Sequence, residues 1–463
     1  MSKKLTYTVQ HVQAGGKNSN SATAAVADKG TQASAAFFSW PIFSFVRSFN
    51  QERFPLLLPA KKSDAREESH DKKILWFIDQ LTDLNGPAMT LKKLGWLAHE
   101  RGIKLSLVSS LFEHERMPDL PPNVINLPML FTWQLPWYKT LTLRIPSLIK
   151  ALRIVKEYRP DEIYISTPGP IGLLGLIAAK LLHVKKIGIY HTDFYIQTLS
   201  LSNNRLVPIV WEKIVQKFYS AMDEIQVPTK EYIGILKKRG YQSEKMTIFR
   251  RGIDSKLFAP RDTGKSFLME KYNIRDGITM LYIGRISHDK NLNFLMDFYR
   301  ELIKRNDNVN LVMVGAGPYF DDLQAAMKDC PRVIFTGQMP QSMLSEIYSG
   351  ADIFVFPSIM DTFGMAVLEA QACGLPAIVT DAGGPKEIII DGSTGFVAEA
   401  NNMDQWLKTF DRAQHMIEKD YNSYLVMKEK SRKHVLDNFN WEITLNTLNG
   451  RASGFEPDKI NIA

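Results

Sequence analysis

The chain has 463 residues, of which 45% are hydrophobic and 23% charged, so it is long enough for two or three globular domains and is not a disordered or fibrous protein. Its two cysteines, Cys330 and Cys373, exclude a disulfide framework of more than one bridge and suit a reducing cytosol. The net charge of +8 arises from 57 basic and 49 acidic residues that are mixed along the chain. This balance is compatible with nucleic acid, anionic lipid or acidic substrates and does not choose among them.

Residues 1–70 differ in composition from the rest of the chain. Residues 13–36 are rich in Gly, Ser, Ala, Thr and Asn, which favours disorder. An aromatic patch follows at Phe37, Phe38, Trp40, Phe43, Phe45 and Phe49, and a charged linker covers residues 61–73. The patch fits equally a segment that packs on the folded body and an anchor in a lipid headgroup layer.

No signal or membrane span is expected. Polar sequence follows Met1–Lys4, where a secretory signal would have an apolar segment. The longest apolar run, residues 171–184, contains Lys180 and is shorter than the roughly 20 residues that cross a bilayer.

Short apolar runs alternate with helical patterns from Ile74 onward, in two successive series. Strands are expected at residues 74–78, 105–108, 163–166, 187–190 and 225–227, and then at 280–283, 311–314, 333–335, 353–356 and 377–379. Such runs between helices are typical of parallel strands that are covered on both faces. The two series predict an α/β protein with two doubly wound, Rossmann-like sheets, divided near residues 258–265 where Pro260, Asp262 and Gly264 interrupt the pattern.

Residues suited to ligand binding follow strands of both series. Gly86 stands just before an expected helix at residues 89–97, where backbone amides attract anions, although a single glycine also fits an ordinary tight turn. In the second series Gly284 and Arg285 directly follow a strand, and Lys290 comes shortly after them. Two cations at the carboxyl end of a strand could clamp a diphosphate, whereas in isolation they would be two solvated charges.

An acidic string follows the expected strand at 353–356. It runs Asp361-Thr-Phe-Gly-Met-Ala-Val-Leu-Glu369, with Gly364 at the start of an expected helix. The first amides of that helix would be free to bind an anion. The two carboxylates could bind different hydroxyls of one ligand, and the alternative is a helix cap with one exposed acid.

The acidic string resembles the donor-site signature of the retaining family-4 (group 1) glycosyltransferases of the GT-B fold, two glutamates separated by seven residues. The chain departs from it at Asp361, which keeps the charge but is one methylene shorter. The resemblance covers roughly residues 74–448. Within the family, the chain resembles a branch that includes mannosyl-type and diacylglycerol-directed transferases. Further matching strings are residues 167–170, 191–194, 221–229, 251–254, 314–318, 335–338 and 351–358.

This resemblance implies two facing Rossmann-like domains, with a C-terminal helix that crosses back to the first. After the partly disordered N-terminal extension at 1–70, which its composition sets apart, we expect an acceptor domain at 71–262, a donor domain at 263–430 and a crossover helix with tail at 431–463. A nucleotide diphosphate sugar, UDP- or GDP-linked, would be the co-substrate. We expect no cofactor and no required metal, because the sequence contains no HExxH, no paired cysteine ligands and no DxD string.

The resemblance also assigns site residues. Catalytic roles fall to Arg285 and Lys290 on the diphosphate, to Asp361 on the sugar, and to His191 near the sugar and its phosphate. A lone histidine at a strand end would otherwise be read as a hydrogen-bonding loop residue. The implied donor-binding residues are Gly86, Gly284, Gly337, Gln338, Phe363, Gly364, Met365 and Glu369, the last on the ribose hydroxyls.

A basic stretch between Tyr138 and Arg159 bears on the acceptor. It contains six basic residues and one acid, Glu157; the basic residues are Lys139, Arg144, Lys150, Arg153, Lys156 and Arg159. Leu148, Leu152 and Val155 recur at helical spacing, and Trp133 and Trp137 are nearby. The stretch fits equally a surface resting on an anionic membrane and a core-facing helix with a solvated basic face.

We therefore expect a lipid or glycan acceptor, an anionic membrane surface as a partner, no nucleic acid, and a cytoplasmic enzyme that is peripheral on the inner face of a membrane. Two alternatives remain: a sugar-nucleotide epimerase or phosphorylase on the same fold, and a degenerate transferase that is a non-catalytic lipid- or partner-binding scaffold. Release of nucleotide diphosphate from a sugar donor would separate them. The sugar, the base, the acceptor and the linkage stay open.

Overall fold

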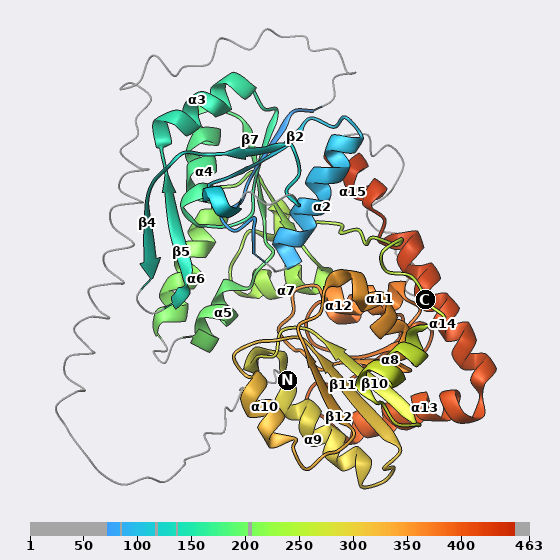
Figure 1. Ribbon diagram of the computed structural model, residues 1–463. Coiled ribbons are helices and arrows are strands. Elements are labelled where there is room, and N and C mark those ends of the chain that lie inside the picture. Colours follow the sequence, from blue (N-terminus) through green and yellow to red (C-terminus); the bar gives the residue numbers. More distant parts are fainter. Residues whose placement is uncertain (1–71, 84–85, 116–118, 136–137, 202–205, 450–463) are drawn as a thin grey trace, which may run out of the picture. The chain divides into compact units, whose positions relative to one another are not determined.

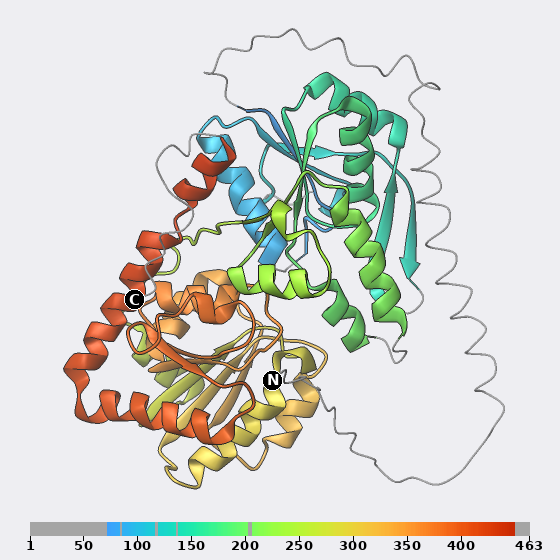
Figure 2. The same cartoon turned by 180° about the vertical axis from the view of Figure 1, so that it is seen from behind.

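The computed structural model describes residues 72–83, 86–115, 119–135, 138–201 and 206–449. Within these ranges the chain forms two parallel sheets, each with helices on both faces (Figure 1 and, from behind, Figure 2). The predictions for the aromatic patch at 37–49, for Trp137 and for the C-terminal tail lie outside the described residues.

The first sheet has seven strands within the described part of the chain, in the order β3-β2-β1-β6-β7-β8-β9, and all pairs are parallel. Its strands are β1 (Ile74–Phe77), β2 (Leu105–Ser109), β3 (Val124–Asn126), β6 (Glu162–Ile165), β7 (Lys185–Ile189), β8 (Glu224–Val227) and β9 (Met246–Ile248). Its helices are α2 (Gly86–Glu100), α3 (Leu148–Tyr158), α4 (Pro170–Leu182), α5 (Phe194–Leu201), α6 (Leu206–Ser220) and α7 (Lys230–Lys238). The order of strands reverses between β1 and β6.

Strand β1 shows why the apolar runs are continuous. Successive side chains of a strand point to opposite faces of the sheet. Leu75 and Phe77 enter one hydrophobic cluster, whereas Ile74 and Trp76 enter another. Both faces are covered, so no position of the strand is left for a polar residue.

The second sheet has six parallel strands among the described residues, in the order β12-β11-β10-β13-β14-β15. They are β10 (Ile278–Ile283), β11 (Val309–Val314), β12 (Val333–Gly337), β13 (Ile353–Phe356), β14 (Ala377–Thr380) and β15 (Gly395–Ala398). The helices are α8 (Gly264–Tyr272), α9 (Leu292–Ile303), α10 (Phe320–Ala326), α11 (Gln341–Gly350), α12 (Met365–Ala372), α13 (Met403–Lys419) and α14 (Tyr421–Asn438). The order reverses between β10 and β13.

The last helix, α15 (Trp441–Leu448), returns to the first sheet. Trp441, Leu445 and Leu448 belong to the same hydrophobic cluster as Ile74 and Trp76 of β1. The expectation of a C-terminal helix that crosses back to the first domain is thus confirmed.

All ten expected strands are present, with ends shifted by a residue or two, and the expected helix at 89–97 lies inside α2. The sequence reading missed β3, β9 and β15, which have only three or four residues. It also missed an antiparallel hairpin of β4 (Met129–Leu135) and β5 (Tyr138–Pro146).

This hairpin corrects the reading of the basic stretch. The helix expected from Leu148, Leu152 and Val155 is α3, but residues 138–146 form strand β5 instead. Arg144 of that strand is not available as a surface charge, because its guanidinium lies 2.6 Å from a carboxylate oxygen of Glu115. Within the described residues no helix is both long enough and apolar enough to cross a bilayer.

Candidate functional site

The predicted site residues gather where the second sheet reverses its strand order. In open α/β sheets, ligands bind beyond the carboxyl ends of the strands at such a reversal. Gly284 and Arg285 directly follow β10, and the loop that leads to Asp361 and Gly364 follows the neighbouring strand β13. Gly337 ends β12 at the same edge of the sheet.

Lys290 and Asp361 form an ion pair at this edge. Lys290 ends the short 3-10 helix η5 (His288–Lys290), and its Nζ lies 2.8 Å from Oδ1 and 2.9 Å from Oδ2 of Asp361. Both side chains are mostly buried, at 16% and 21% exposed, so the pair is better shielded from water than a surface pair. The structure thus joins two residues that the sequence reading assigned to different parts of the ligand.

Arg285 is more exposed and has a partner that the sequence reading missed. Its side chain is 55% exposed, and its guanidinium donates to both carboxylate oxygens of Asp289 at 3.1 Å. Burial opposes ionisation of Asp289, but the neighbouring Lys290 and Arg285 charges contribute to keeping its pKa below the usual value. The spacing of Arg285 and Asp289 would have revealed this pair if the intervening string had been read for charge.

The amino end of α12 presents unpaired donors. Gly364 precedes the helix with φ of 98°, a backbone that glycine adopts readily, and a Cβ added there would lie 2.9 Å from Cγ of Pro385. Among the described residues, the amides of Gly364, Met365 and Ala366 donate no hydrogen bond, and no side chain caps the helix. Such a helix start is suited to an anion.

Gly86 lies beside this helix start. A Cβ added to Gly86, the first residue of α2, would lie 3.8 Å from Cγ of Met365. Two predicted donor-binding residues, far apart in sequence, are therefore neighbours.

Glu369 lies farther along α12. The hydroxyl of Tyr348, from α11, donates to Oε2 of Glu369 at 2.9 Å. Burial raises the pKa of Glu369 to about 7, and the hydrogen bond from Tyr348 acts in the opposite direction. The sequence reading missed Tyr348, because its contact with Glu369 depends on the packing of two helices.

His191 follows β7 and is 6% exposed. Its Nδ1 lies 2.9 Å from NH2 of Arg251, and its carbonyl oxygen accepts a hydrogen bond of 3.0 Å from the hydroxyl of Thr362. Burial, reinforced by the charge of Arg251, holds the pKa of His191 well below its ordinary value, so the imidazole is neutral. The contact with Thr362 joins His191 to the acidic string.

Among the described residues, the remaining predicted ones form no hydrogen bond or ion pair with the Lys290–Asp361 pair. Phe363 is buried, and the Arg251 guanidinium lies over its ring at 5.1 Å. The amide of Gly284 donates to Val314, and the carbonyl of Gly337 accepts from Gly315, so both glycines continue the sheet pairing at the carboxyl ends of its strands. Gln338 is exposed, and in the described part of the chain no hydrogen bond joins it to the Lys290–Asp361 pair.

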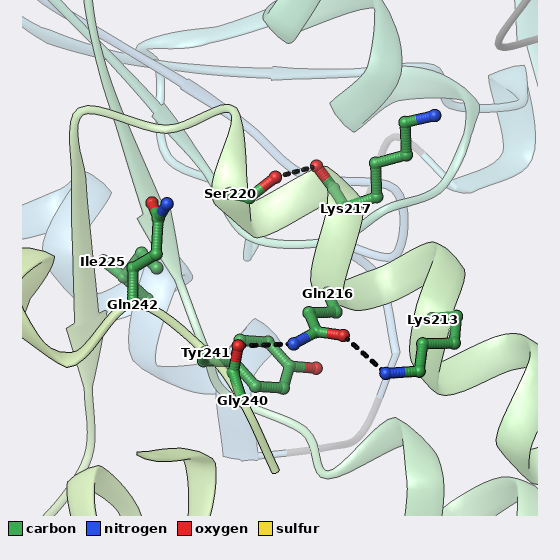
Figure 3. Close-up of a pocket in the computed structure, with 8 residues that line it drawn as sticks. All are labelled: Lys213, Gln216, Lys217, Ser220, Ile225, Gly240, Tyr241 and Gln242. Carbon is green, nitrogen blue, oxygen red and sulfur yellow. Dashed lines mark hydrogen bonds between the residues drawn. The ribbon is translucent and has the colours of Figure 1, made fainter.

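A hollow of about 250 Å³ lies elsewhere, between α6 and residues 240–242. Figure 3 shows Gln216 between two partners, accepting from Lys213 and donating to the carbonyl of Gly240. No predicted site residue lines this hollow, and the amide side chain of Gln216 already has two hydrogen-bond partners. We therefore assign no ligand to the hollow. Within the described ranges, no group of three or more His, Cys, Asp or Glu side chains is arranged to hold a metal ion.

Two family matches follow one another along the chain. Residues 84–257 match the family described as Glycosyltransferase Family 4, and residues 265–434 match the family described as Glycosyl transferases group 1. They cover the two parts of the chain that carry the two sheets, except for strand β1, which precedes the first match.

Three curated relatives are similar to this chain. The sulfoquinovosyl transferase SQD2 of Arabidopsis thaliana is 28% identical over 58% of this chain and 52% of that protein. The alpha-monoglucosyldiacylglycerol synthase of Streptococcus pneumoniae is 32% identical over 50% and 54%, and a GDP-mannose-dependent alpha-mannosyltransferase of Corynebacterium glutamicum is 30% identical over 64% and 68%. The matched region thus spans about half the length of the first two relatives.

Solved structures agree in fold. The sucrose-phosphate synthase of Thermosynechococcus elongatus superposes with a TM-score of 0.63 at 18% identity, over 82% of this chain and 98% of that one. Anabaena HepE in complex with UDP-glucose gives 0.63 at 16%, over 81% and 98%. The family matches and the corynebacterial relative show that the chain belongs to the family-4 (group 1) glycosyltransferases, with the GT-B fold.

Proposed function

We propose that this chain transfers a sugar from a nucleotide diphosphate sugar to a hydroxyl group of an acceptor, with retention at C1 and without a required metal ion. The observation that carries the proposal is the uncapped start of α12 beside the Lys290–Asp361 pair. Unpaired amides and an ammonium group, held at one sheet edge, are suited to a diphosphate.

The diphosphate is the leaving group, and negative charge builds on it as the bond from C1 breaks. The amides of Gly364, Met365 and Ala366, with Lys290, stabilise that charge; fixed donors of this kind contribute roughly 3–4 kcal/mol each in favourable cases. Before the donor binds, Asp361 neutralises Lys290. When the bound diphosphate replaces Asp361 as the partner of the Lys290 ammonium group, the carboxylate of Asp361 becomes available to accept hydrogen bonds from sugar hydroxyls.

Arg285 and Glu369 complete the donor site in this proposal. Arg285 is exposed enough to turn from Asp289 to an incoming phosphate, since a single surface ion pair is worth no more than about 1 kcal/mol. Glu369 accepts hydrogen bonds from the ribose hydroxyls and is oriented by Tyr348. Retention, with attack from the face of the leaving group, is proposed on the resemblance to the family.

The donor and the acceptor are proposed as classes. The names of relatives include a GDP-mannose-dependent enzyme, and a structural neighbour is described in complex with UDP-glucose. We therefore propose a UDP- or GDP-linked sugar. Two relatives are named for sulfoquinovosyl transfer and for glucosyl diacylglycerol synthesis, which supports a lipid or glycan acceptor.

A lipid acceptor would require the chain to meet a membrane surface on the cytoplasmic side. Strand β4 exposes Leu130, Phe131 and Trp133, and the cross-strand partners of the two aromatics are Ile145 and Leu143. Helix α3 exposes its basic residues Lys150, Arg153 and Lys156. Exposed apolar groups beside basic side chains are suited to an anionic headgroup layer, where each basic residue contributes about 1 kcal/mol.

Flotation with liposomes tests the membrane part of the proposal. We expect the protein to float with anionic liposomes at low salt and less at high salt, because salt screens the basic term. Charge reversal at Lys150, Arg153 and Lys156 should remove the part of membrane binding that depends on salt. Deletion of residues 1–60, which include the aromatic patch at 37–49, should weaken the part of membrane binding that does not depend on salt. If the intact protein stays in the soluble fraction at low salt, a soluble acceptor is the better proposal.

The transferase proposal is tested by release of nucleotide diphosphate from UDP- and GDP-sugars, with and without EDTA. A thermal-shift screen identifies the base beforehand, because a ligand at 100 times its Kd stabilises the folded state by about 2.7 kcal/mol. Release that survives EDTA supports the metal-independent reaction. Neither binding nor release with any donor would favour the non-catalytic scaffold.

A further inference from the structure

Arg251 is a buried cation without a carboxylate partner among the described residues. It follows β9 and is 4% exposed. In the described part of the chain, the one hydrogen bond of its side chain goes to His191, and its Nε has no partner. Burial lowers the pKa of Arg251 only to about 10, so the guanidinium is charged at neutral pH. Burying an unpaired charge costs several kcal/mol, and packing alone would be served as well by methionine.

The contact with Arg251 determines which nitrogen of His191 carries the proton. A guanidinium has only donors, so Nδ1 of His191, 2.9 Å from NH2, must be the acceptor and carries no hydrogen. A neutral imidazole then has its hydrogen on Nε2. The environment of Arg251 therefore selects one of the two tautomers.

The Nε2 atom is buried and has no hydrogen-bond partner in the described part of the chain. A buried N–H group without an acceptor is unfavourable, and such groups are rare unless a ligand or water completes them. The carbonyl of the same residue is bonded to Thr362, next to Asp361 of the site. The described residues therefore leave the acceptor for this N–H group to be supplied by another group.

The aromatic ring of Phe363 is a second contact of the guanidinium. The distance of 5.1 Å from the guanidinium carbon to the ring centre is within the range of cation–π attraction. Phe363 belongs to the acidic string, so Arg251 lies between His191 and the loop that carries Asp361. Among the described residues, His191 and Phe363 are the two side chains through which Arg251 is joined to the candidate site.

We propose that Arg251 is a positioning residue that holds His191 as the Nε2–H tautomer, so that the imidazole donates a hydrogen bond to a phosphate or sugar oxygen of the bound donor and does not act as a base. This inference rests on the proposed transferase function for the identity of the ligand. The tautomer itself is a property of the free protein and can be measured without turnover.

Nitrogen NMR of protein labelled with 15N-histidine tests the tautomer. The chain has nine histidines, and the resonances of His191 are assigned by their absence from His191→Gln. We expect His191 to be neutral with its hydrogen on Nε2. If the acceptor is a phosphate oxygen, the Nε2 resonance should shift when UDP or GDP is added. If the acceptor is a sugar oxygen, the resonance should shift only with the intact nucleotide sugar. A wild-type His191 with its hydrogen on Nδ1, or doubly protonated, overturns the proposal.

Arg251→Met removes the donor while keeping much of the volume. We expect the His191 resonances to change toward mixed tautomers, and kcat to fall about 10- to 100-fold with a smaller change in KM for the donor. Arg251→Lys, which restores a donor, should recover part of both. An unchanged tautomer with unchanged kcat in Arg251→Met contradicts the inference.

Arg432→Met is the matched control. Arg432 is a partly buried arginine that donates to the backbone carbonyls of Phe258 and Ala372, and it has no contact with His191. It should lose stability without moving the His191 resonances. If Arg251→Met does not fold, the wild-type tautomer and Arg251→Lys still decide the question. If the wild type transfers no sugar, the proposed function fails while the tautomer measurement in the free protein stands.

Discussion

The two sheets reverse their strand order in the same way, but within the described ranges they differ in whether the helix that starts at the reversal is capped. In the first sheet Asp79, after β1, accepts hydrogen bonds from the Thr167 hydroxyl and from the amides of Ile171 and Gly172, at 2.8 and 3.3 Å for the amides. The start of α4 is thus capped by the protein itself. In the second sheet the start of α12 has no such cap among the described residues.

The carboxylate of Asp79 makes the difference between the two helix starts, and Gly169 allows it to approach the start of α4. A Cβ added to Gly169 would lie 2.5 Å from the carboxyl carbon of Asp79, so the close approach requires glycine there. Burial raises the pKa of Asp79, although its hydrogen bonds act against this. The comparison teaches that a helix start at a strand reversal can bind an external anion only when the chain does not supply its own carboxylate there.

The largest expected effect comes from removing the groups at the strand reversal of the second sheet. Lys290→Ala and Glu369→Ala should each reduce turnover by at least about 100-fold, because each removes a fixed group that holds the donor, while the fold stays intact. Turnover with a UDP- or GDP-sugar and circular dichroism are the measurements. Lys186→Ala, which breaks an ion pair with Asp223 in the first sheet, is the control and should have little effect. Near-normal turnover in either site variant would show that the donor site is assigned wrongly.

Activity should depend more on the charge of the side chain at position 361, at the start of the uncapped helix α12, than on its length. Asp361→Glu should be tolerated, because glutamate stands there in the family signature, whereas Asp361→Asn should lose about tenfold or more in kcat/KM. Asparagine also leaves Lys290 without its counter-charge. Equal activity of the asparagine variant would exclude a role of the carboxylate toward the sugar.

Asp79, which caps α4 at the strand reversal of the first sheet (the filled reversal), should contribute to the stability of the fold and not to the affinity for the nucleotide. Asp79→Asn keeps the size of the side chain but weakens the cap of α4, and loss of such a cap reduces the free energy of unfolding by about 1 kcal/mol. Denaturant unfolding measures this change, and a thermal-shift titration measures nucleotide affinity. A weakened nucleotide affinity with unchanged stability would reverse the roles of the two helix starts.

The fold followed from the sequence because both faces of each sheet are buried, and a strand buried on both faces is apolar at every position. The residues of the site were predictable as far as they follow strands directly, as Arg285 and His191 do. Their partners were not, because Tyr348 reaches Glu369, and Arg251 reaches His191, through packing between distant segments. The sequence analysis missed the hairpin of β4 and β5 because it belongs to neither parallel sheet, and residues 130–134 of β4 are exposed, so they do not form a buried apolar run.

The smallest expected effect is on the pH dependence of stability. Glu369 has a pKa raised by burial to about 7 in the folded chain, against 4.5 as its ordinary value. A carboxyl with a raised folded pKa contributes stability that is fully present below its unfolded pKa and is lost as pH rises to about 7. Glu369→Gln stays neutral and keeps an acceptor for Tyr348, so it does not lose this contribution.

The wild type should therefore lose more stability than Glu369→Gln between pH 4.5 and 7, and the difference should be constant above pH 8. Because the side chain is only partly buried, we expect a difference of about 1 kcal/mol and not the full value of the pKa shift. Thermal unfolding at several pH values from 4.5 to 8 measures it, with Asp79→Asn in parallel, since that carboxyl also has a raised pKa but lies at the filled reversal. A saturating nucleotide sugar, whose diphosphate does not ionise between pH 4.5 and 8, should change the pH dependence of the wild type and of Asp79→Asn, because the ribose hydroxyls favour the ionised Glu369. It should leave that of Glu369→Gln as it was. Parallel curves for all three proteins would show that the environment of Glu369 is not the one described.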